Sequence, residues 1–382
     1  MLAPNSMATV VVLLVLGLAG LVTVARLGWR PLALPPALAV VASAVLAGAL
    51  WVNVTYDYYQ SWSDAWADIS GAPLPTEPLP RALPSSAPLP AAPSADPSSA
   101  TPAAPHAVPG RGRLVSMTLA GNASGLSRPA VVWLPAAYDD PGQRAARFPV
   151  LLLLHGDPGE PRGFVYGMHV DRVAGSLDRT GTPYVIVMPT VWQGWHGQQC
   201  LDGRRGPRDE TYLTTDVPQS LQRQLRVTPP GRSWALAGLS EGGYCAVDLA
   251  LRHPDLFAGA ASLDGYYAPM TRGGLGWRLF GGDRRAQAAA TPLLTVQSWP
   301  TRSRAPALWL MAGDADARDL TQARTFAGAA ARVAQVRVVI VRGGNHTTPA
   351  WRTALPDLLT WARALLGGRS PQTGQITLPI QA

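Results

Sequence analysis

The pentapeptide Gly-Leu-Ser-Glu-Gly at residues 238–242 constrains the fold of this chain more than any other feature. It follows an apolar run at residues 234–237 and precedes a segment at residues 244–252 whose composition predicts a helix. A Gly-x-Ser-x-Gly pattern between a strand and a helix predicts a sharp, strained turn, because larger residues would clash there. Such a turn would expose the hydroxyl of Ser240 at the edge of a sheet. The pattern alone is common by chance, so its weight depends on partners elsewhere in the chain.

Two later apolar runs end in residues that could act together with such a serine. Residues 307–311 lead into an aspartate-rich loop, and residues 336–341 lead into Arg-Gly-Gly-Asn-His, which ends at His346. Parallel sheets place catalytic groups beyond the carboxyl ends of their strands, so distant loop residues converge there. We predict that His346 acts as a general base for Ser240, because imidazole exchanges protons near neutral pH.

The acid that would orient His346 has three candidates in the loop after residue 313. We predict Asp316, the third residue after Gly313, and keep Asp314 and Asp319 as alternatives. The order serine, acid, histidine along the chain is the order found in sheets of this kind.

A fully apolar run at residues 150–154 predicts a strand that is buried on both faces. It opens into His-Gly-Asp-Pro-Gly, a loop suited to hold an oxyanion. We expect the backbone N–H groups of Asp157 and Glu241 to be the oxyanion-hole donors. We expect His155, at the strand end, to be a buried, hydrogen-bonded ring and not a second base.

Together these segments resemble the serine esterase family of the α/β-hydrolase superfamily, which includes S-formylglutathione hydrolase (esterase D), feruloyl esterases and mycobacterial mycolyltransferases. The resemblance covers residues 114–366, and its matching segments are 128–135, 148–156, 238–243, 253–257 and 343–346, with Trp351 behind the last. It implies an α/β-hydrolase fold, with a mostly parallel central sheet and helices on both faces. It also implies a Ser-His-Asp triad and an acyl-enzyme intermediate.

The segment from Cys200 to residue 218, paired with Cys245, is similar to the membrane-anchored exported esterases of actinobacteria. Cys245 lies one helical turn beyond the serine, and Cys200 follows a strand predicted at residues 184–188 that ends on the same side. An oxidising compartment permits a disulfide, so we predict a Cys200–Cys245 bridge. Two unrelated buried thiols are the alternative.

Two uncharged apolar runs, residues 8–25 and residues 32–52, are 18 and 21 residues long, enough to cross a bilayer. Arg26 and Arg30 between them place that turn in the cytoplasm by the positive-inside rule. We predict a multi-pass membrane protein whose catalytic domain is extracytoplasmic. A cleaved signal peptide is the alternative for the first run.

Composition divides the rest of the chain. Twelve prolines from Pro73 to Pro109, mixed with alanine and serine, predict an extended spacer. We therefore predict a two-helix anchor at residues 1–62, a linker at 63–110, a hydrolase domain at 111–368 and a flexible tail at 369–382. The aromatic residues near the end of the second apolar run suit an interfacial belt or packing against the hydrolase. They are Trp51, Tyr56, Tyr58, Tyr59, Trp62 and Trp66.

The net charge is +8 and every basic side chain is an arginine, since the chain contains no lysine. Arginines at 204, 205, 208, 284 and 285 could contact anionic lipid or a carboxylated substrate, although solvated loop arginines explain them as well. No recognition motif for nucleic acid, no metal-ligand spacing and no cofactor fingerprint is present, so we expect none of these partners. Pocket walls could come from Trp192, Trp195 and His196, or from residues 264–267.

These patterns predict a membrane-anchored extracytoplasmic serine esterase that hydrolyses carboxylic esters. If an alcohol outcompetes water, the same residues would make an acyltransferase that resembles the mycolyltransferases and acts on cell-envelope lipids or glycans. A non-catalytic envelope scaffold on a hydrolase fold is the second alternative, because a fold does not guarantee a function.

Overall fold

The computed structural model describes residues 2–27, 31–72, 74, 76, 112–178, 181–192, 197–204, 206–300 and 305–380. The chain divides into two compact units, of which the first is Met1–Leu74 with the short segments Tyr166–Met168 and Thr347–Pro349. The second unit contains the remaining residues from Pro75 to Ala382. Most of the predicted Pro-rich linker, residues 77–111, lies outside the described residues.

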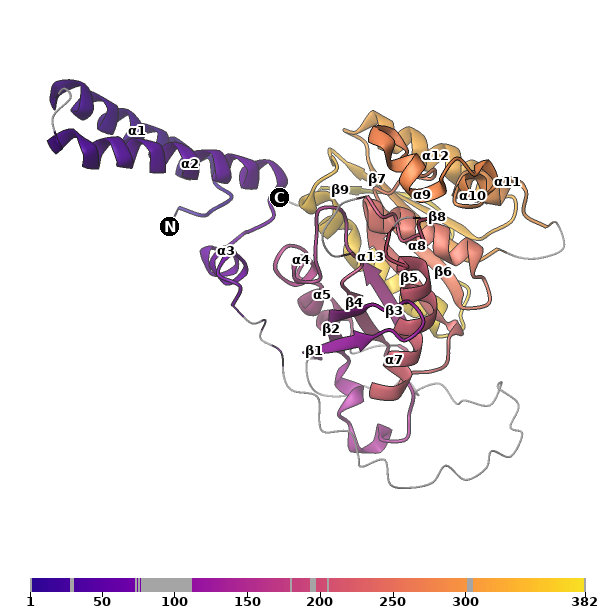
Figure 1. The fold of residues 1–382 in the computed structure, drawn as a ribbon. Coiled ribbons are helices and arrows are strands. Elements are labelled where there is room, and N and C mark those ends of the chain that lie inside the picture. The colour runs from indigo at the N-terminus through magenta and orange to yellow at the C-terminus, as the bar shows by residue number, and fades with distance from the viewer. Residues whose placement is uncertain are drawn as a thin grey trace. The chain divides into compact units, whose positions relative to one another are not determined.

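The N-terminal unit consists of the helices α1 (Met7–Leu27), η1 (Pro31–Ala33), α2 (Leu34–Tyr56) and α3 (Trp62–Ile69). The first and third of these lie side by side as a hairpin (Figure 1). They approach closely where a side chain on Gly20 would meet Cγ2 of Val40 at 2.9 Å. Near the other end of the hairpin, Asn5 Nδ2 donates to Asp57 Oδ1 at 2.6 Å.

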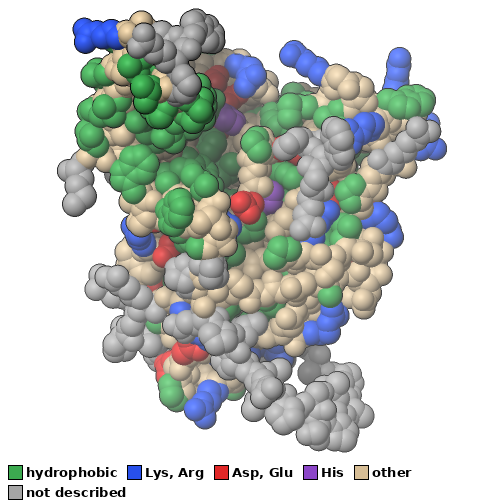
Figure 2. Space-filling view, turned by 60° about the vertical axis from the view of Figure 1, so that its left-hand side comes forward, with side chains coloured by type: hydrophobic (Ala, Val, Ile, Leu, Met, Phe, Trp, Pro, Cys, Tyr) green, Lys and Arg blue, Asp and Glu red, His purple; other side chains and the backbone are tan. Residues whose placement is uncertain are grey.

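In the described part of the chain, α1 and α2 are long and apolar enough to cross a bilayer, a property that an N-terminal signal sequence shares. Their large apolar side chains are mostly exposed, and they form the green surface at the upper left of Figure 2. Of the predicted aromatic belt, Trp51, Tyr56, Trp62 and Trp66 are exposed. The belt and the span itself stay predictions.

The second unit is built on a nine-stranded sheet in the order β1-β2-β4-β3-β5-β6-β7-β8-β9. The first two strand pairs, β1 with β2 and β2 with β4, are antiparallel, and all the others are parallel. The strands are β1 (Arg113–Ala120), β2 (Ser127–Leu134), β3 (Val150–Leu154), β4 (Val185–Pro189), β5 (Gly231–Leu239), β6 (Phe257–Leu263), β7 (Ala307–Gly313), β8 (Val336–Arg342) and β9 (Gly374–Pro379).

Helices cover both faces of this sheet (Figure 1). On one face α8 packs on β3, β5 and β6, and α12 packs on β7 and β8. On the opposite face α13 covers β4, where Leu359 O accepts the Tyr184 hydroxyl, and β7, where Asp357 accepts the Trp309 indole. The helices of this unit are α4 (Arg162–Tyr166), α5 (Val170–Leu177), α6 (Asp209–Thr211), α7 (Val217–Gln224), α8 (Glu241–Arg252), α9 (Leu275–Phe280), α10 (Arg284–Ala289), α11 (Pro292–Gln297), α12 (Ala317–Ala330) and α13 (Thr348–Leu366), with one-turn helices η3 (Ala136–Tyr138), η4 (Pro141–Gln143), η5 (Tyr212–Asp216) and η6 (Arg272–Gly274).

Buried apolar side chains form a core on both faces of the sheet, one beneath α8 and α12 and one beneath α13. The central strands β3, β4 and β7 are buried along their whole length, as parallel strands covered on both faces must be. The predicted strands at residues 150–154, 307–311 and 336–341 are confirmed, as is the strand that leads into Ser240. The expected fold, a mostly parallel sheet with helices on both faces behind two apolar helices, is confirmed.

Two of the predicted boundaries need correction. Residues 374–379 form β9, which pairs in parallel with β8, so the predicted tail at 369–382 is not flexible throughout. This strand is mostly exposed at the sheet edge, and its sequence therefore carries little of the apolar signal of a buried strand. The predicted linker also starts too early, because α3 extends to Ile69.

Candidate active site

Ser240 lies in the turn between β5 and α8, with φ of 54° and ψ of −120°, a region that side chains other than glycine rarely adopt. The glycines on either side make this turn feasible. A Cβ on Gly238 would overlap the carbonyl of Gly242, and a Cβ on Gly242 would overlap the carbonyl of Leu154. The predicted nucleophile elbow is therefore confirmed as backbone geometry.

The carboxyl ends of β5 to β8 are joined directly to one another around this turn. The N–H of Ser240 donates to Leu263 O at 2.9 Å, and the N–H of Asp264 donates to Met311 O at 3.0 Å. At the end of β7, a Cβ on Gly313 would overlap the carbonyl of Gly344. The serine and the loop that carries His346 consequently occupy one edge of the sheet, as predicted from the ends of their strands.

His346 forms a pair with a carboxylate of the first turn of α12. Its Nδ1 lies 2.8 Å from Oδ2 of Asp319, whose side chain is only 6% exposed. A carboxylate accepts, so Nδ1 carries the proton and Nε2 is left to accept one. Burial lowers the pKa of His346, but the hydrogen bond to Asp319 and the charge of Asp264 outweigh it, and the pKa is raised. For Asp319, burial raises the pKa, but the hydrogen bond and the charge of His346 outweigh this effect, and the pKa of Asp319 is lowered.

The prediction that Asp316 orients His346 is wrong. Asp316 is the N-cap of α12, and its Oδ1 accepts the backbone N–H groups of Arg318 and Asp319, both at 3.0 Å. Asp314 accepts the backbone N–H of Gly343 at 2.6 Å. Since α12 begins right after Asp316, its first turn brings Asp319 round toward His346. An aspartate before a helix is a preferred cap, and this signal could have identified Asp316 as one.

The structure describes both Ser240 and His346 and has no hydrogen bond between the serine hydroxyl and the imidazole. Contacts of this kind are often long in unliganded enzymes and tighten when the substrate is bound. The His346–Asp319 pair is thus observed, whereas proton transfer from Ser240 to His346 is an expectation.

The loop after β3 lies against the nucleophile turn, where the oxyanion hole was predicted. A Cβ on Gly156 would lie 3.3 Å from the Cβ of Ser240, so the two backbones are neighbours. His155 is buried, and its Nε2 accepts the N–H of Val191 while Nδ1 lies 3.0 Å from Gly156 O. Burial lowers the pKa of His155 to about 4, so the ring is neutral and structural, as expected.

The predicted oxyanion donors belong to residues whose side chains fix neighbouring loops. Asp157 Oδ2 accepts the N–H of Gly197 at 2.8 Å, and the buried Glu241 accepts the N–H of Gln199 through Oε1 at 2.9 Å. Glu241 is the first residue of α8, so its backbone N–H group points out of the N-terminal end of the helix. Their placement suits an oxyanion hole formed by the N–H groups of Asp157 and Glu241, and that role stays a prediction.

The predicted disulfide is confirmed. The Cys200–Cys245 bridge has an S–S distance of 2.06 Å and joins the loop after β4 to the second turn of α8. Together with the Gln199–Glu241 hydrogen bond, it ties this loop to the helix that follows the serine.

A third carboxyl group lies at the centre of this edge. Asp264 follows β6, is 2% exposed, and has φ of +47°. It was predicted only as part of a pocket wall, because nothing in its sequence neighbourhood shows what it contacts. Burial raises the pKa of Asp264 to about 7, against the opposing influence of His346.

Of the other predicted wall residues, Trp192 is buried and packs edge-on against His155 at 4.7 Å. This packing makes it part of the core beneath the loop after β3. Tyr266 stacks on Tyr244 of α8 at 4.8 Å, which places the loop after β6 beside the nucleophile helix. Trp195 and His196, and the basic residue Arg205, lie outside the described residues.

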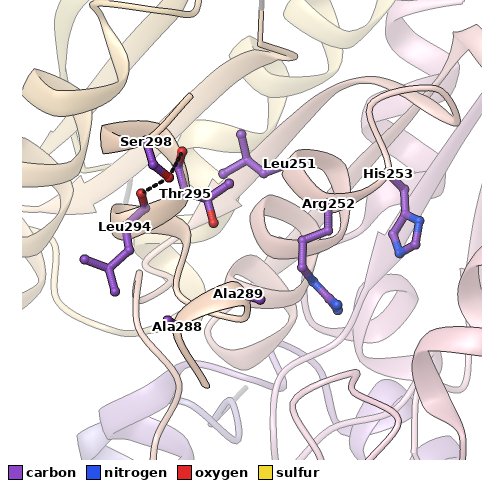
Figure 3. Close-up of a pocket in the computed structure, with 8 residues that line it drawn as sticks. All are labelled: Leu251, Arg252, His253, Ala288, Ala289, Leu294, Thr295 and Ser298. Carbon is purple, nitrogen blue, oxygen red and sulfur yellow. Dashed lines mark hydrogen bonds between the residues drawn. The ribbon is translucent and has the colours of Figure 1, made fainter. Parts of the chain in front are cut away.

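A cavity of about 560 Å³ lies elsewhere, at the C-terminal end of α8 (Figure 3). Leu251, Arg252 and His253 line one side of it, and Leu294, Thr295 and Ser298 of the α11 region line the other. None of the predicted site residues lines it. In the described ranges, no cluster of three or more His, Cys, Asp or Glu side chains could hold a metal ion.

Curated bacterial proteins that are similar in sequence to the chain include the following two. An uncharacterized protein of Corynebacterium glutamicum is 29% identical over 265 residues, which cover 65% of this chain and 61% of that protein. The diacylglycerol acyltransferase/mycolyltransferase Ag85A of Mycobacterium leprae is 35% identical over 92 residues, which cover 22% of this chain and 27% of that protein. The match thus spans less than two thirds of the length of either relative.

Solved structures show the same fold at low sequence identity. A ferulic acid esterase superposes with a TM-score of 0.57 at 24% identity, covering 67% of this chain and 99% of that one. An S-formylglutathione hydrolase from Agrobacterium tumefaciens superposes with a TM-score of 0.56 at 18% identity, covering 67% of this chain and 96% of that one. The family model Esterase, described as "Putative esterase", matches residues 121–363. Nucleophile elbow, sheet order and family match agree, and the chain belongs to this esterase family of α/β-hydrolases.

Proposed function

We propose that this protein is a serine esterase that hydrolyses carboxylic esters through Ser240, His346 and Asp319. The observation that carries the proposal is the strained Ser240 turn on the same sheet edge as the His346–Asp319 pair at 2.8 Å. Strain at a serine persists only where the surrounding structure holds it, and such strain is concentrated at functional sites. Family membership supports a hydrolase or acyl-transfer reaction at this edge.

The chemistry follows from the proton positions. His346 Nε2 takes the proton of Ser240 Oγ as the oxygen attacks the ester carbonyl carbon, and the carbonyl electron pair moves onto its oxygen. The N–H groups of Asp157 and Glu241 stabilise this oxyanion, and Asp319 stabilises the imidazolium. The C–O bond to the alcohol then breaks, and the departing alkoxide takes the proton from His346.

Water completes the cycle. His346 takes one proton from the water as its oxygen attacks the acyl carbon, and the bond to Ser240 then breaks. The serine oxygen recovers its proton from His346, and the carboxylic acid leaves. The sum is ester plus water giving acid plus alcohol, with no cofactor consumed.

An acyltransferase is the second candidate, because the local match to the Mycobacterium leprae diacylglycerol acyltransferase/mycolyltransferase reaches 35% identity. In that reaction the hydroxyl of an acceptor alcohol replaces water, and the same three residues serve. Added alcohols that divert the acyl group from water would support this variant.

We further propose that α1 and α2 anchor the chain in the cell membrane and that the hydrolase unit faces outward. The two helices meet the requirements for spans, and a disulfide is typical of oxidising compartments. A charged, membrane-impermeant fluorophosphonate added to intact expressing cells should then label the protein. Labelling that requires cell lysis would contradict the outward orientation.

The central test is fluorophosphonate labelling of the full-length chain in detergent, because this probe reports an activated serine without a known substrate. We expect the parent to be labelled, and Ser240→Ala and His346→Ala to lose labelling. Ser233→Ala is the matched control, since this serine lies near the start of β5, at the end of the strand opposite the turn, where its Oγ donates to Thr228 Oγ1 at 2.9 Å. A folded parent that stays unlabelled would favour the non-catalytic scaffold.

A further inference from the structure

The buried Asp264 has an environment that the proposed mechanism does not yet explain. It is the first residue after β6, between the strand that precedes Ser240 and the strand that precedes Asp319. The left-handed φ of +47° turns its backbone sharply at this point, a conformation that costs a non-glycine residue about 1 kcal/mol or more. Burying an ionisable side chain costs free energy, and so does its strained backbone. Packing alone therefore does not explain an aspartate at this position.

Both carboxylate oxygens of Asp264 have defined donors. Oδ1 accepts the N–H of Gly313 at 3.2 Å, and Oδ2 accepts the indole Nε1–H of Trp351 at 2.7 Å. Trp351 lies in the first turn of α13, five residues after His346. Its ring packs edge-to-face with the imidazole of His346, with centroids 5.2 Å apart and planes at 84°.

We propose that Asp264 is a positioning residue for His346, which it serves by fixing the Trp351 ring against the imidazole and by placing a carboxylate behind it. This inference rests on the proposed function, because it assigns a role relative to the base of that mechanism. His346 would then be held from two sides. Asp319 binds Nδ1 directly, and Asp264 acts through Trp351.

A neutral acceptor could hold the Trp351 indole equally well, so the carboxylate needs a further reason. Among the described residues, the groups that influence Asp264 electrostatically are His346, which favours its ionised form, and Asp319, which disfavours it. His346 in turn senses Asp264, Asp319 and Asp316. The hydroxyl of Tyr267 also responds to Asp264. The cation in this cluster is thus the imidazolium that the mechanism creates, and Asp264 stabilises it.

This arrangement makes a prediction about pH. The pKa of Asp264 is raised by burial to about 7, and the pKa of His346 is raised by its carboxylate neighbours. The two groups therefore titrate as a coupled pair, and activity falls at acid pH when the pair takes up its proton. Removing the Asp264 carboxylate removes one of the influences that raise the His346 pKa. The acid limb of the rate profile should then move to lower pH.

The test measures the second-order rate of fluorophosphonate labelling from pH 4.5 to 9 for the full-length chain in detergent. The probe does not titrate in this range, so the acid limb reports the enzyme. Asp264→Asn should shift this limb down by about half a pH unit or more. Its plateau rate should fall by about tenfold or more, because the amide places an NH2 donor where one of the two acceptor oxygens stood, facing either the Gly313 N–H or the Trp351 indole, and the imidazole is displaced.

Trp351→Phe separates the two parts of the role, because it keeps a ring and removes the indole donor. It should lower the plateau and leave the acid limb closer to that of the parent. The double variant should lose less than the product of the two single losses, since both changes act on one contact.

Asp357→Asn is the matched control. Asp357 also lies on α13 and accepts an indole N–H, from Trp309 at 2.8 Å, on the face of the sheet opposite α8. It also pairs with the buried Arg337 at 2.6 Å, so its loss should lower the stability of the fold. We expect the variant to change neither limb nor plateau. Circular dichroism melting of each variant verifies folding at the assay temperature.

The outcomes separate the two proposals. A labelled parent whose acid limb is the same in Asp264→Asn would overturn the positioning role and leave the esterase proposal standing. A lower plateau labelling rate in Asp264→Asn with an unchanged acid limb would show that Asp264 has only a structural role. A folded parent that fails to label at all would overturn both.

Discussion

The two ends of α8 each carry a cluster of ionisable side chains, and the clusters are built on different principles. At the C-terminal end, Arg252 lies 2.9 Å from Asp248 and 2.6 Å from Glu210. Glu210 also contacts His253 at 2.8 Å. The central cation of this cluster is a guanidinium, which stays protonated at every pH at which the protein is folded.

At the N-terminal end of α8, beside Ser240, the cation is a histidine. His346 contacts Asp319, and the buried Asp264 lies behind it. Its charge appears only when it takes a proton, so the surrounding carboxylates do not fully determine its state. A cluster held by arginine is fixed near neutral pH, whereas a cluster held by histidine can exchange a proton during each turnover.

This difference between the arginine and histidine clusters also explains why the cavity in Figure 3 does not mark a reactive site. It opens at the end of α8 where Arg252 pairs with two carboxylates, those of Asp248 and Glu210. Burial raises the pKa of Asp248 to about 6, which still leaves this carboxyl ionised at neutral pH. The hollow thus lies over an ion-paired cluster, and neither Ser240 nor His346 lines it.

The largest expected effect is at the histidine-held cluster. Asp319→Asn keeps the size of the side chain but removes the acceptor that fixes the His346 tautomer. Comparable changes in serine hydrolases cost about 10⁴-fold in rate, and we expect a loss of about 10³ to 10⁴ in labelling rate.

Asp316→Asn is the paired variant, because the sequence alone favoured Asp316. Its side chain caps α12, so the change should keep nearly the parent labelling rate and cost at most about 1 kcal/mol of stability. Equal losses in both variants would contradict the assignment of Asp319. A larger loss at Asp316 would restore the sequence-based choice.

The sequence favours Asp316 as the partner of His346, whereas the structure has Asp319 in that place. Strand ends could be predicted from apolar runs, and parallel strands bring their carboxyl ends together, so Ser240 and His346 were located correctly at one edge. The choice among three aspartates depended on where α12 begins. A shift of three residues is almost one helical turn, and helix boundaries are the least certain part of such predictions.

Other features could not be predicted because they depend on tertiary contacts. Asp264 meets Trp351 across 87 positions of sequence, and no local pattern announces that hydrogen bond. By contrast, the Cys200–Cys245 bridge was predictable. Two cysteines, two strand ends on one edge and an expected oxidising compartment left few arrangements.

The arginine-held cluster should matter for stability and not for rate. Arg252→Met removes the cation and leaves the buried Asp248 without its partner. Breaking a buried pair in this way costs roughly 3–5 kcal/mol. Denaturant unfolding should show this loss, while the labelling rate of the folded fraction stays at the parent value.

The double variant Asp248→Asn with Arg252→Met serves as its control, because it removes both charges. It should recover part of the lost stability. A large drop in labelling rate in folded Arg252→Met would break the distinction between the two ends of α8.

The disulfide ties the second turn of α8 to the loop that Glu241 also holds. Replacing both cysteines, Cys200→Ser with Cys245→Ser, opens a loop that spans 45 positions and should cost about 2–4 kcal/mol. Thermal melts with and without reductant measure this directly. Reductant should lower the melting temperature of the parent and leave the double variant unchanged.

Glu210→Gln should cost less stability than opening the disulfide, and its value lies in the pH dependence. Burial raises the pKa of Glu210, but its contacts with His253 and Arg252 outweigh this, and the pKa is lowered. A lowered carboxyl pKa stabilises the folded state above the ordinary value of 4.5, and this contribution is lost as the pH falls through the folded-state pKa. At pH 7 the variant should be less stable than the parent by roughly 1.5–3 kcal/mol, the range for a hydrogen bond to a charged group. The difference in stability should close as the pH falls below 4.5, because protonation then removes the same contacts from the parent.

The measurement is the free energy of unfolding of both proteins as a function of pH. Since other carboxyl groups titrate alike in both proteins, the difference between the two pH profiles isolates Glu210. A difference that stayed constant down to pH 3 would show that the charge of Glu210 contributes nothing, and that the C-terminal cluster of α8 is held by packing instead of by Arg252.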